Sequence, residues 1–167
     1  MDRDPLRQQL LRLLDGVDAH MPFEEAVAAF PNEAMNERPP NVDYTPWHLI
    51  EHLRLTQADI LEYVTNPDYI EREWPREYWP DPSANATRSA WDGSVAGFLA
   101  DRATIRELLA DDGDDLFAVL PGTSGHTLLR EIRIVADHNA YHVGEFAILR
   151  KVMGTWPPGH DAGRLDR

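Results

Sequence analysis

The sequence predicts an all-α protein in which four helical segments pack as a four-helix bundle. Three observations predict this fold: apolar residues recur at helical spacing, no stretch sustains the alternation of a strand, and proline- and asparagine-rich stretches separate the segments. The chain has 167 residues, of which 43% are hydrophobic, so it can bury one core. We expect the bundle to occupy residues 1–154 and a C-terminal tail to follow over residues 155–167.

The first predicted helix begins at Pro5, a residue type favoured in the first helical turn, and carries a leucine-rich stripe as far as Val17. A short helical continuation is expected over residues 23–30, because acidic residues and alanines there favour a helix and Pro31 ends it. Residues 31–45 are predicted to form a loop, since they hold three prolines and three asparagines.

The second predicted helix runs from Pro46 to Val64, with Thr45 as its N-cap. The connection that follows, residues 66–82, is rich in aromatic residues and prolines and is longer than an antiparallel neighbour requires. A long crossover lets the second and third helices lie parallel to one another, as in some helical bundles.

The third predicted helix is capped by Ser83 or Asn85 and continues to Leu109. The fourth has Thr127 as its N-cap and runs to Met153, and it ends at the following glycine. Arg150 and Lys151 suit the negative end of this helix dipole.

Charge and composition exclude several classes of function. Lys plus Arg is 16 and Asp plus Glu is 29, a net charge of −13 that repels phosphate backbones and anionic lipids, so neither nucleic acid nor membrane is expected as a partner. The absence of cysteine excludes disulfides, thiolate metal sites and cysteine nucleophiles. With no secretory signal and no long apolar run in the sequence, we expect a soluble cytoplasmic protein.

Four of the seven histidines form two pairs, and each pair is spaced by four residues: His48 with His52, and His138 with His142. Residues at this spacing lie on one face of a helix, where two imidazoles can reach one metal ion. His138 and His142 continue the apolar stripe of the last helix, and His52 lies near the stripe of the second.

Three converging histidines leave one coordination position open, which is typical of catalytic zinc sites. His48 lies one turn nearer the helix start and is either a fourth ligand or a residue at the rim of the bundle. On the pattern alone, a plain bundle without metal, whose histidines are core or surface residues, remains an equal alternative.

Two motifs resemble those of the DinB-like superfamily. Residues 47–53 (Trp-His-Leu-Ile-Glu-His-Leu) resemble the opening of its second helix. Residues 137–146 (Asp-His-Asn-Ala-Tyr-His-Val-Gly-Glu-Phe), with the lead-in over residues 125–129, resemble its fourth. The length of the chain and the long connection between the second and third helices also match, so the resemblance covers nearly the whole chain.

The resemblance implies a four-helix bundle of up-down-down-up topology, often dimeric, with a divalent metal held by His52, His138 and His142. His48 has no regular counterpart in the family. Zinc is the first expectation for an all-imidazole set of ligands and nickel the alternative.

Characterised members of the superfamily include thiol-dependent transferases and isomerases that use low-molecular-weight thiols. The resemblance therefore implies a metal-dependent thiol (S-)transferase, or a related hydrolase, acting on a small electrophilic substrate. The alternative is a non-catalytic metal-binding module with a role in binding or in stress responses.

Side chains near the histidines are predicted to support the site. Glu145 or Asp137 can orient the imidazole rings and Tyr141 can give further support, although an ordinary surface charge is the better interpretation of Asp137. The aromatic residues of the connection either cover the site and shape a pocket or only pin a long loop to the bundle. These residues are Tyr69, Trp74, Tyr78 and Trp79, with Pro75 and Pro80 between them.

Overall fold

The computed structural model describes residues 5–111, 113 and 115–160, and within them it is all-helical, which confirms the predicted fold class. It has five α-helices instead of four, because the short continuation predicted after the first helix folds as a separate helix, α2. The elements are α1 (Pro5–Asp15), α2 (Phe23–Val27), the 3-10 helix η1 (Asn32–Ala34), α3 (Pro46–Thr65), α4 (Arg88–Ala110) and α5 (Leu128–Met153).

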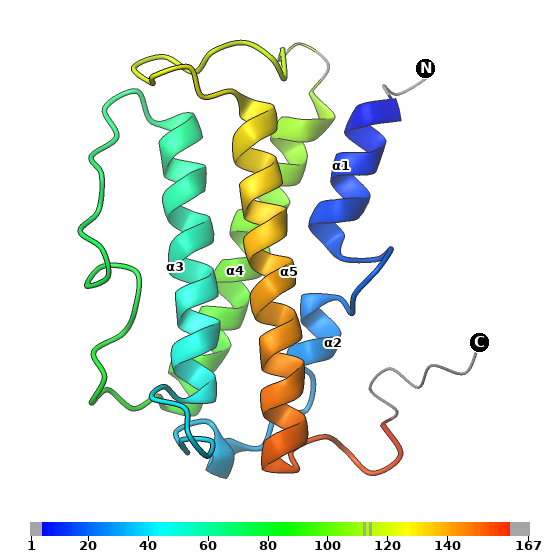
Figure 1. Ribbon diagram of the computed structural model, residues 1–167, viewed down its shortest axis with the longest axis vertical. Coiled ribbons are helices and arrows are strands. Elements are labelled where there is room, and N and C mark those ends of the chain that lie inside the picture. The colour runs from blue at the N-terminus through cyan, green and yellow to red at the C-terminus, as the bar shows by residue number, and fades with distance from the viewer. Residues whose placement is uncertain (1–4, 112, 114, 161–167) are drawn as a thin grey trace.

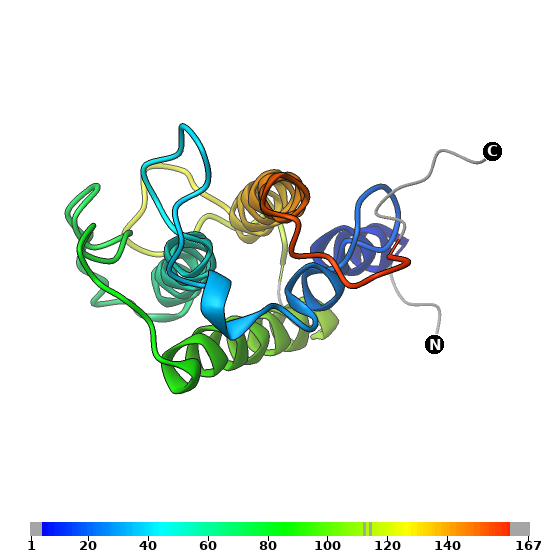
Figure 2. The ribbon, with the colours of Figure 1, turned by 90° about the horizontal axis from the view of Figure 1, so that it is seen from below.

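The long helices lie side by side, with α4 and α5 between α3 and α1 (Figures 1 and 2). In Figure 1, α3 and α4 run upward and α1 and α5 run downward. The connection after α3 returns along the outside of the molecule to the start of α4, which allows these two helices to run in the same direction. In the described part of the chain, no helix has the length and apolar character needed to cross a membrane.

The core consists of two groups of buried side chains at different heights in the bundle. The lower group gathers around α2, where Phe23 stacks on Phe98 at 3.9 Å between ring centroids. The upper group joins α1 to α4 and α5 and includes Leu10, Leu109 and Ile132, each at most 6% exposed. Each fully buried side chain of this kind stabilises the fold by roughly 1.5–3 kcal/mol, so both groups hold the helices in register.

The predicted caps of α3 and α5 are confirmed. The Thr45 hydroxyl accepts from the backbone N–H of His48, and Pro46 is the first helical residue. The Thr127 hydroxyl caps α5, and Gly154 closes that helix in the left-handed conformation at φ 65°. A glycine suits that position because it has no Cβ to clash there.

The predicted cap of α4 is wrong: the helix begins after Thr87, whose hydroxyl accepts from the backbone N–H of Ala90, and neither Ser83 nor Asn85 caps it. A tertiary contact explains the shift. The Asn36 side chain accepts from the backbone N–H of Ala86 and donates to its carbonyl, which holds the chain outside the helix up to this point.

Arg150 has a larger role than the helix-dipole interaction expected from the sequence. Its side chain is 0% exposed and donates to the carbonyl oxygens of Ala26, Ala28 and Thr155. The guanidinium also lies 3.9 Å from the ring centroid of Trp156. Arg150 therefore ties α2 and the start of the segment after Gly154 to α5, while residues 161–167 of the predicted tail lie outside the described part.

Candidate metal centre

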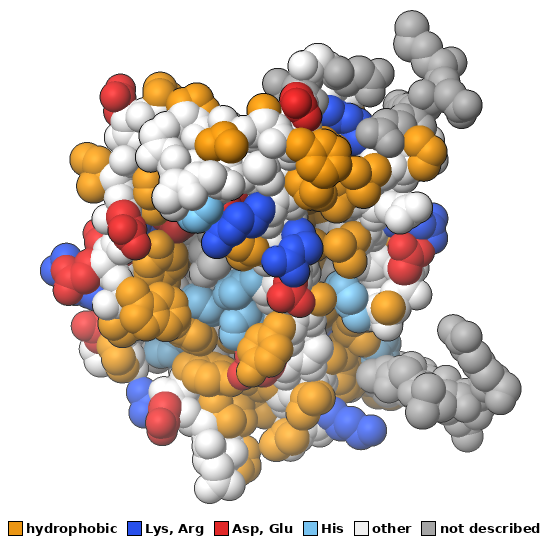
Figure 3. All heavy atoms as spheres, turned by 45° about the horizontal axis from the view of Figure 1, so that its top comes forward, with side chains coloured by type: hydrophobic (Ala, Val, Ile, Leu, Met, Phe, Trp, Pro, Cys, Tyr) orange, Lys and Arg blue, Asp and Glu red, His pale blue; other side chains and the backbone are white. Residues whose placement is uncertain are grey.

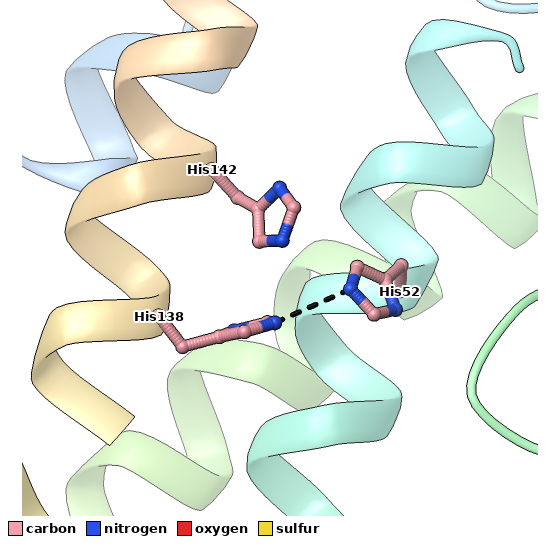
Figure 4. A group of neighbouring side chains, drawn as sticks. All are labelled: His52, His138 and His142. Atoms are coloured by element: carbon pink, nitrogen blue, oxygen red, sulfur yellow. Dashed lines mark hydrogen bonds between the residues drawn. The ribbon is translucent and has the colours of Figure 1, made fainter. Parts of the chain in front are cut away.

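Three histidines from two helices meet between α3 and α5 (Figure 4). His52 lies on α3, and His138 and His142 lie on α5, one turn apart. One ring nitrogen from each can be chosen so that all three lie within 4.8 Å of one another. The structure thus brings together the three histidines that the sequence singled out.

Hydrogen bonds fix which nitrogen of two of these rings carries the proton. His52 Nδ1 lies 2.7 Å from the carbonyl oxygen of Tyr78, and His142 Nδ1 lies 2.6 Å from Glu145 Oε2. Because these oxygens only accept, each Nδ1 is the donor, and the Nε2 of His52, a neutral ring, is left as an acceptor. Nε2 of His52 accepts a hydrogen bond from Nε2 of His138 at 3.2 Å (Figure 4), a contact that a shared cation would replace.

Burial keeps the imidazoles of His52 and His138 neutral. It lowers the pKa of His52 from 6.5 to about 4, and the nearby His142 lowers it further, against the opposing effect of the Tyr78 carbonyl. Burial likewise lowers the pKa of His138 to about 3, with added contributions from His142 and His52. Neutral imidazole is the form that binds metals, so at neutral pH these two rings need not lose a proton before they bind an ion.

Glu145 holds a negative charge next to the cluster. Burial alone would raise the pKa of its carboxyl group, but hydrogen bonds from His142 and from the Tyr44 hydroxyl outweigh burial and lower it. The carboxylate therefore stays ionised, orients His142 and offsets the charge of a bound cation. Of the supporting residues predicted from the sequence, Glu145 contacts a histidine ring in this way, and the exposed Asp137 fits the surface interpretation.

Aromatic residues of the connection cover one side of His52. The Trp79 ring stacks on the His52 ring with centroids 3.9 Å apart and planes within 7°, and Trp74 meets the same ring edge-on at 6.5 Å. Tyr69 and Tyr78 instead donate their hydroxyls to the buried carboxylate of Asp59 on α3. Trp74 and Trp79 therefore cover the site, whereas Tyr69 and Tyr78 pin the connection to the bundle.

His48 stands apart from the cluster, because both of its ring nitrogens are already bonded. Nδ1 accepts from the backbone N–H of Thr45, and Nε2 lies 3.0 Å from the carbonyl oxygen of Ala84 and donates to it. His48 completes the capping box of α3 and anchors the end of the connection. Its place in the structure leaves it no free lone pair for a metal.

Tyr44 is the contributor that the sequence did not indicate. It lies in the loop before α3 and reaches Glu145 on α5 across 101 positions of the chain. Neither spacing nor periodicity connects two residues so far apart, so only the fold reveals this contact. Tyr141, named as a supporting residue from the sequence, has its ring edge-on to that of His142, with centroids 4.8 Å apart.

The cluster is accessible from one face of the molecule. Figure 3 shows histidine side chains at the bottom of a hollow near the middle of that face, with hydrophobic side chains around it. His52 is buried, whereas His138 and His142 are only partly buried. A bound ion at this place would lie near solvent on one side and against the helices on the other.

An all-helical protein with three imidazoles converging between two helices belongs to the class of bundles that can hold a divalent metal. The family model of the DinB superfamily matches residues 16–146, which include all three histidines. The chain therefore belongs to the DinB superfamily, which confirms the resemblance seen in the sequence. Comparisons with curated proteins and with solved structures found no match.

Replacing Glu145 with Gln should weaken zinc binding by about 10- to 100-fold, because the variant keeps the shape of the side chain but loses the charge that orients His142. Calorimetric titration of metal-free protein with zinc measures this change. Asp137→Asn, on the same helix but exposed, is the matched control and should bind as the wild type does. Equal affinity of all three proteins would contradict a supporting role for Glu145.

The metal-free protein should lose stability as the pH falls below about 6.5. The pKa values of His52 and His138 are lowered in the folded state, so below pH 6.5 the unfolded chain binds more protons than the folded chain does. Above pH 6.5, the pKa of an unfolded histidine, the two residues cost the folded state no stability. As the pH falls from 6.5 toward the folded pKa values of about 4 and 3, the free energy of unfolding decreases. Each should cost about 1–2 kcal/mol of unfolding free energy between pH 7 and pH 5.

Urea unfolding of metal-free protein at several pH values checks this dependence. The comparison protein is His138→Gln, which removes one of the two groups and should show a smaller loss over the same interval. A stability that is flat between pH 7 and pH 5 in the wild type would show that the imidazoles titrate normally.

Proposed function

We propose that the protein binds one divalent metal ion through the Nε2 atoms of His52, His138 and His142, and that this centre is catalytic. The activity we propose is that of a metal-dependent thiol (S-)transferase, or a related hydrolase, acting on a small electrophilic substrate. The observation that carries the proposal is the convergence of three imidazoles, two with their Nδ1 protons held by acceptors. Zinc is the expected ion and nickel the alternative.

The set of donors fits such an ion. Three nitrogen ligands leave one position free, in the manner of catalytic zinc sites, whereas structural zinc sites use four protein ligands. When bound, a divalent ion supplies a Lewis acid that lowers the pKa of a thiol or a water at the free position. The partly exposed His138 and His142 leave that position reachable by a small molecule.

The side chains of the protein have supporting roles in this proposal. Trp79 packs against the whole face of His52 and keeps water from that side of the ring. Burial, together with the neighbouring Glu145, raises the pKa of Tyr44, so Tyr44 stays a phenol. It therefore positions the Glu145 carboxylate and does not act as a base.

We further propose that the four long helices form an up-down-down-up bundle, with α2 as an addition, and that two copies of the chain pair. The helix directions in Figure 1 support the topology.

The outer face of α5 supports pairing of two chains, since it exposes three apolar side chains in one stripe: Tyr141, Ile148 and Val152, by 70, 67 and 58%. Light scattering should give twice the chain mass of 19.0 kDa, and a single-chain mass at all concentrations would contradict pairing.

A specific observation favours the alternative, a metal-binding module without turnover. Among the described residues, none of the three histidines lines the pocket of about 440 Å³ formed beside the connection. A metal centre that lies outside this pocket suits a binding or stress-response module, which needs no substrate cavity beside the ion.

Turnover separates the two proposals. The zinc-loaded, tag-free protein is offered several low-molecular-weight thiols together with epoxide, alkyl halide and activated alkene substrates, and wild type is compared with His52→Ala. Thiol-dependent product formation in the wild type alone supports the transferase. Equal rates in both proteins would remove the catalytic role, and tight zinc binding without any turnover would favour the module.

A further inference from the structure

A pocket of about 440 Å³ lies between the loop before α3 and the connection after it. This volume falls in the range of small-molecule sites, roughly 300–1,000 Å³. Three rings line it, those of Tyr44, His48 and Trp79. The connection adds three prolines to the same wall: Pro75, Pro80 and Pro82.

The polar atoms of two of these rings, those of Tyr44 and His48, are already bonded within the protein. Both nitrogens of His48 have backbone partners, and the Tyr44 hydroxyl donates to Glu145. The pocket thus offers ring faces and proline carbons to an occupant. An occupant with a buried charge would leave that charge without a partner there, which is costly.

Charged residues occur only where the pocket meets solvent. Asp43, Arg76 and Asp81 line this outer part and are exposed, and the Asp81 carboxylate is already bonded to Ser83. These exposed charges accompany a wall that is otherwise made of rings and prolines, as at sites for small apolar molecules.

Two residues of the pocket wall also touch the metal centre. The Trp79 ring stacks on His52, and the Tyr44 ring lies 5.5 Å from that of Trp79. Tyr44 also bonds Glu145, which holds His142. An occupant packed against Trp79 and Tyr44 therefore contacts the residues that position two of the three histidines.

We infer that this pocket binds a flat, uncharged aromatic group of a small molecule, and that its occupancy is coupled to metal binding through Trp79 and Tyr44. On the proposed function, on which this assignment rests, the aromatic group is the apolar part of the substrate. Coupling is reciprocal: if the occupant changes the affinity for zinc, zinc changes the affinity for the occupant by the same factor.

The probe for the pocket is 2-naphthol, a small, uncharged and fluorescent ring compound. Metal-free wild-type protein should bind it saturably at one site. Pro82→Trp places a large side chain in the pocket and should weaken binding at least tenfold, whereas Pro158→Trp, at an exposed proline far along the chain, should leave it unchanged. The charged analogue 2-naphthoate should bind at least tenfold more weakly than 2-naphthol.

Three outcomes would overturn the inference: no saturable binding in the wild type, equal affinity of the two tryptophan variants, or equal affinity for the neutral and charged probes. Circular dichroism melting of Pro82→Trp verifies that the variant is folded. If it is not, the comparison of the two probes on the wild type still decides.

Zinc titrations with and without 2-naphthol test the coupling and keep this inference separate from the proposed function. The probe should change the zinc affinity at least threefold in the wild type and leave it unchanged in Pro82→Trp. An unchanged zinc affinity in the wild type would overturn the coupling. If zinc does not bind at all while 2-naphthol does, the proposed function and the coupling fail together, and the pocket remains a site for apolar rings.

Discussion

His138→Ala is expected to abolish stoichiometric metal binding. Tag-free wild-type protein, equilibrated with zinc and freed of excess ion, should carry about one equivalent, and the variant less than about a tenth. The reason lies in the geometry: the three imidazoles come from only two helices, and removing one leaves two nitrogen donors, too few for a tetrahedral site that also keeps a free position. Mass spectrometry of the metal content measures both values.

The matched control is His126→Ala, a histidine just before the same helix that bonds to Tyr63 and lies outside the cluster. It should retain about one equivalent of zinc. Zinc should also raise the melting temperature of the wild type and of the control but not that of His138→Ala, since a ligand that binds only the folded state stabilises it. One equivalent in His138→Ala, or none in the wild type, would contradict the assignment.

Arg150→Met is expected to destabilise the fold by about 3–5 kcal/mol, the largest loss expected from a residue outside the metal centre. The wholly buried guanidinium donates to three backbone carbonyls, and it lies over the rings of Trp156 and Phe30 at 3.9 and 5.2 Å from their centroids. Methionine keeps the apolar stem but leaves those buried acceptors unpaired, at about 1–3 kcal/mol each before the chain relaxes. Burial lowers the pKa of Arg150 to about 10, so it remains charged at neutral pH.

Urea unfolding monitored by circular dichroism measures the change. Lys151→Met alters the next residue, which is exposed, and should change the unfolding free energy by less than about 0.5 kcal/mol. If the two variants lose the same stability, Arg150 does not tie α2 and the segment after Gly154 to α5.

The helix boundaries that could be predicted from the sequence are those set by local chemistry. Thr45 followed by Pro46, and Gly154 after a long periodic stripe, determine their own conformations within a few residues. The start of α4 could not be predicted in this way, because Asn36 holds Ala86 outside the helix from 50 positions away. Arg150 illustrates the same limit: position on the helix indicates a dipole contact, and only the fold reveals the carbonyls around it.

The metal centre likewise has residues that the sequence could identify and contacts that only the fold reveals. The spacing of four residues and the apolar stripe of α5 could identify His138 and His142, whereas the choice of His52 over His48 comes from the resemblance to the family's second helix. The stacking of Trp79 on His52 and the bond from Tyr44 to Glu145 depend on how the loops on both sides of α3 fold back onto the bundle. Such contacts have no periodic signature, so sequence patterns identify ligands more readily than the residues that hold them.

Anomalous diffraction from crystals of the zinc-loaded protein, measured on both sides of the zinc absorption edge, tests the central claim most directly. We expect one strong anomalous peak per chain between α3 and α5, at about 2.0–2.1 Å from the Nε2 atoms of His52, His138 and His142. A zinc peak bound elsewhere on the chain, with these three imidazoles making no contact to an ion, would contradict the account.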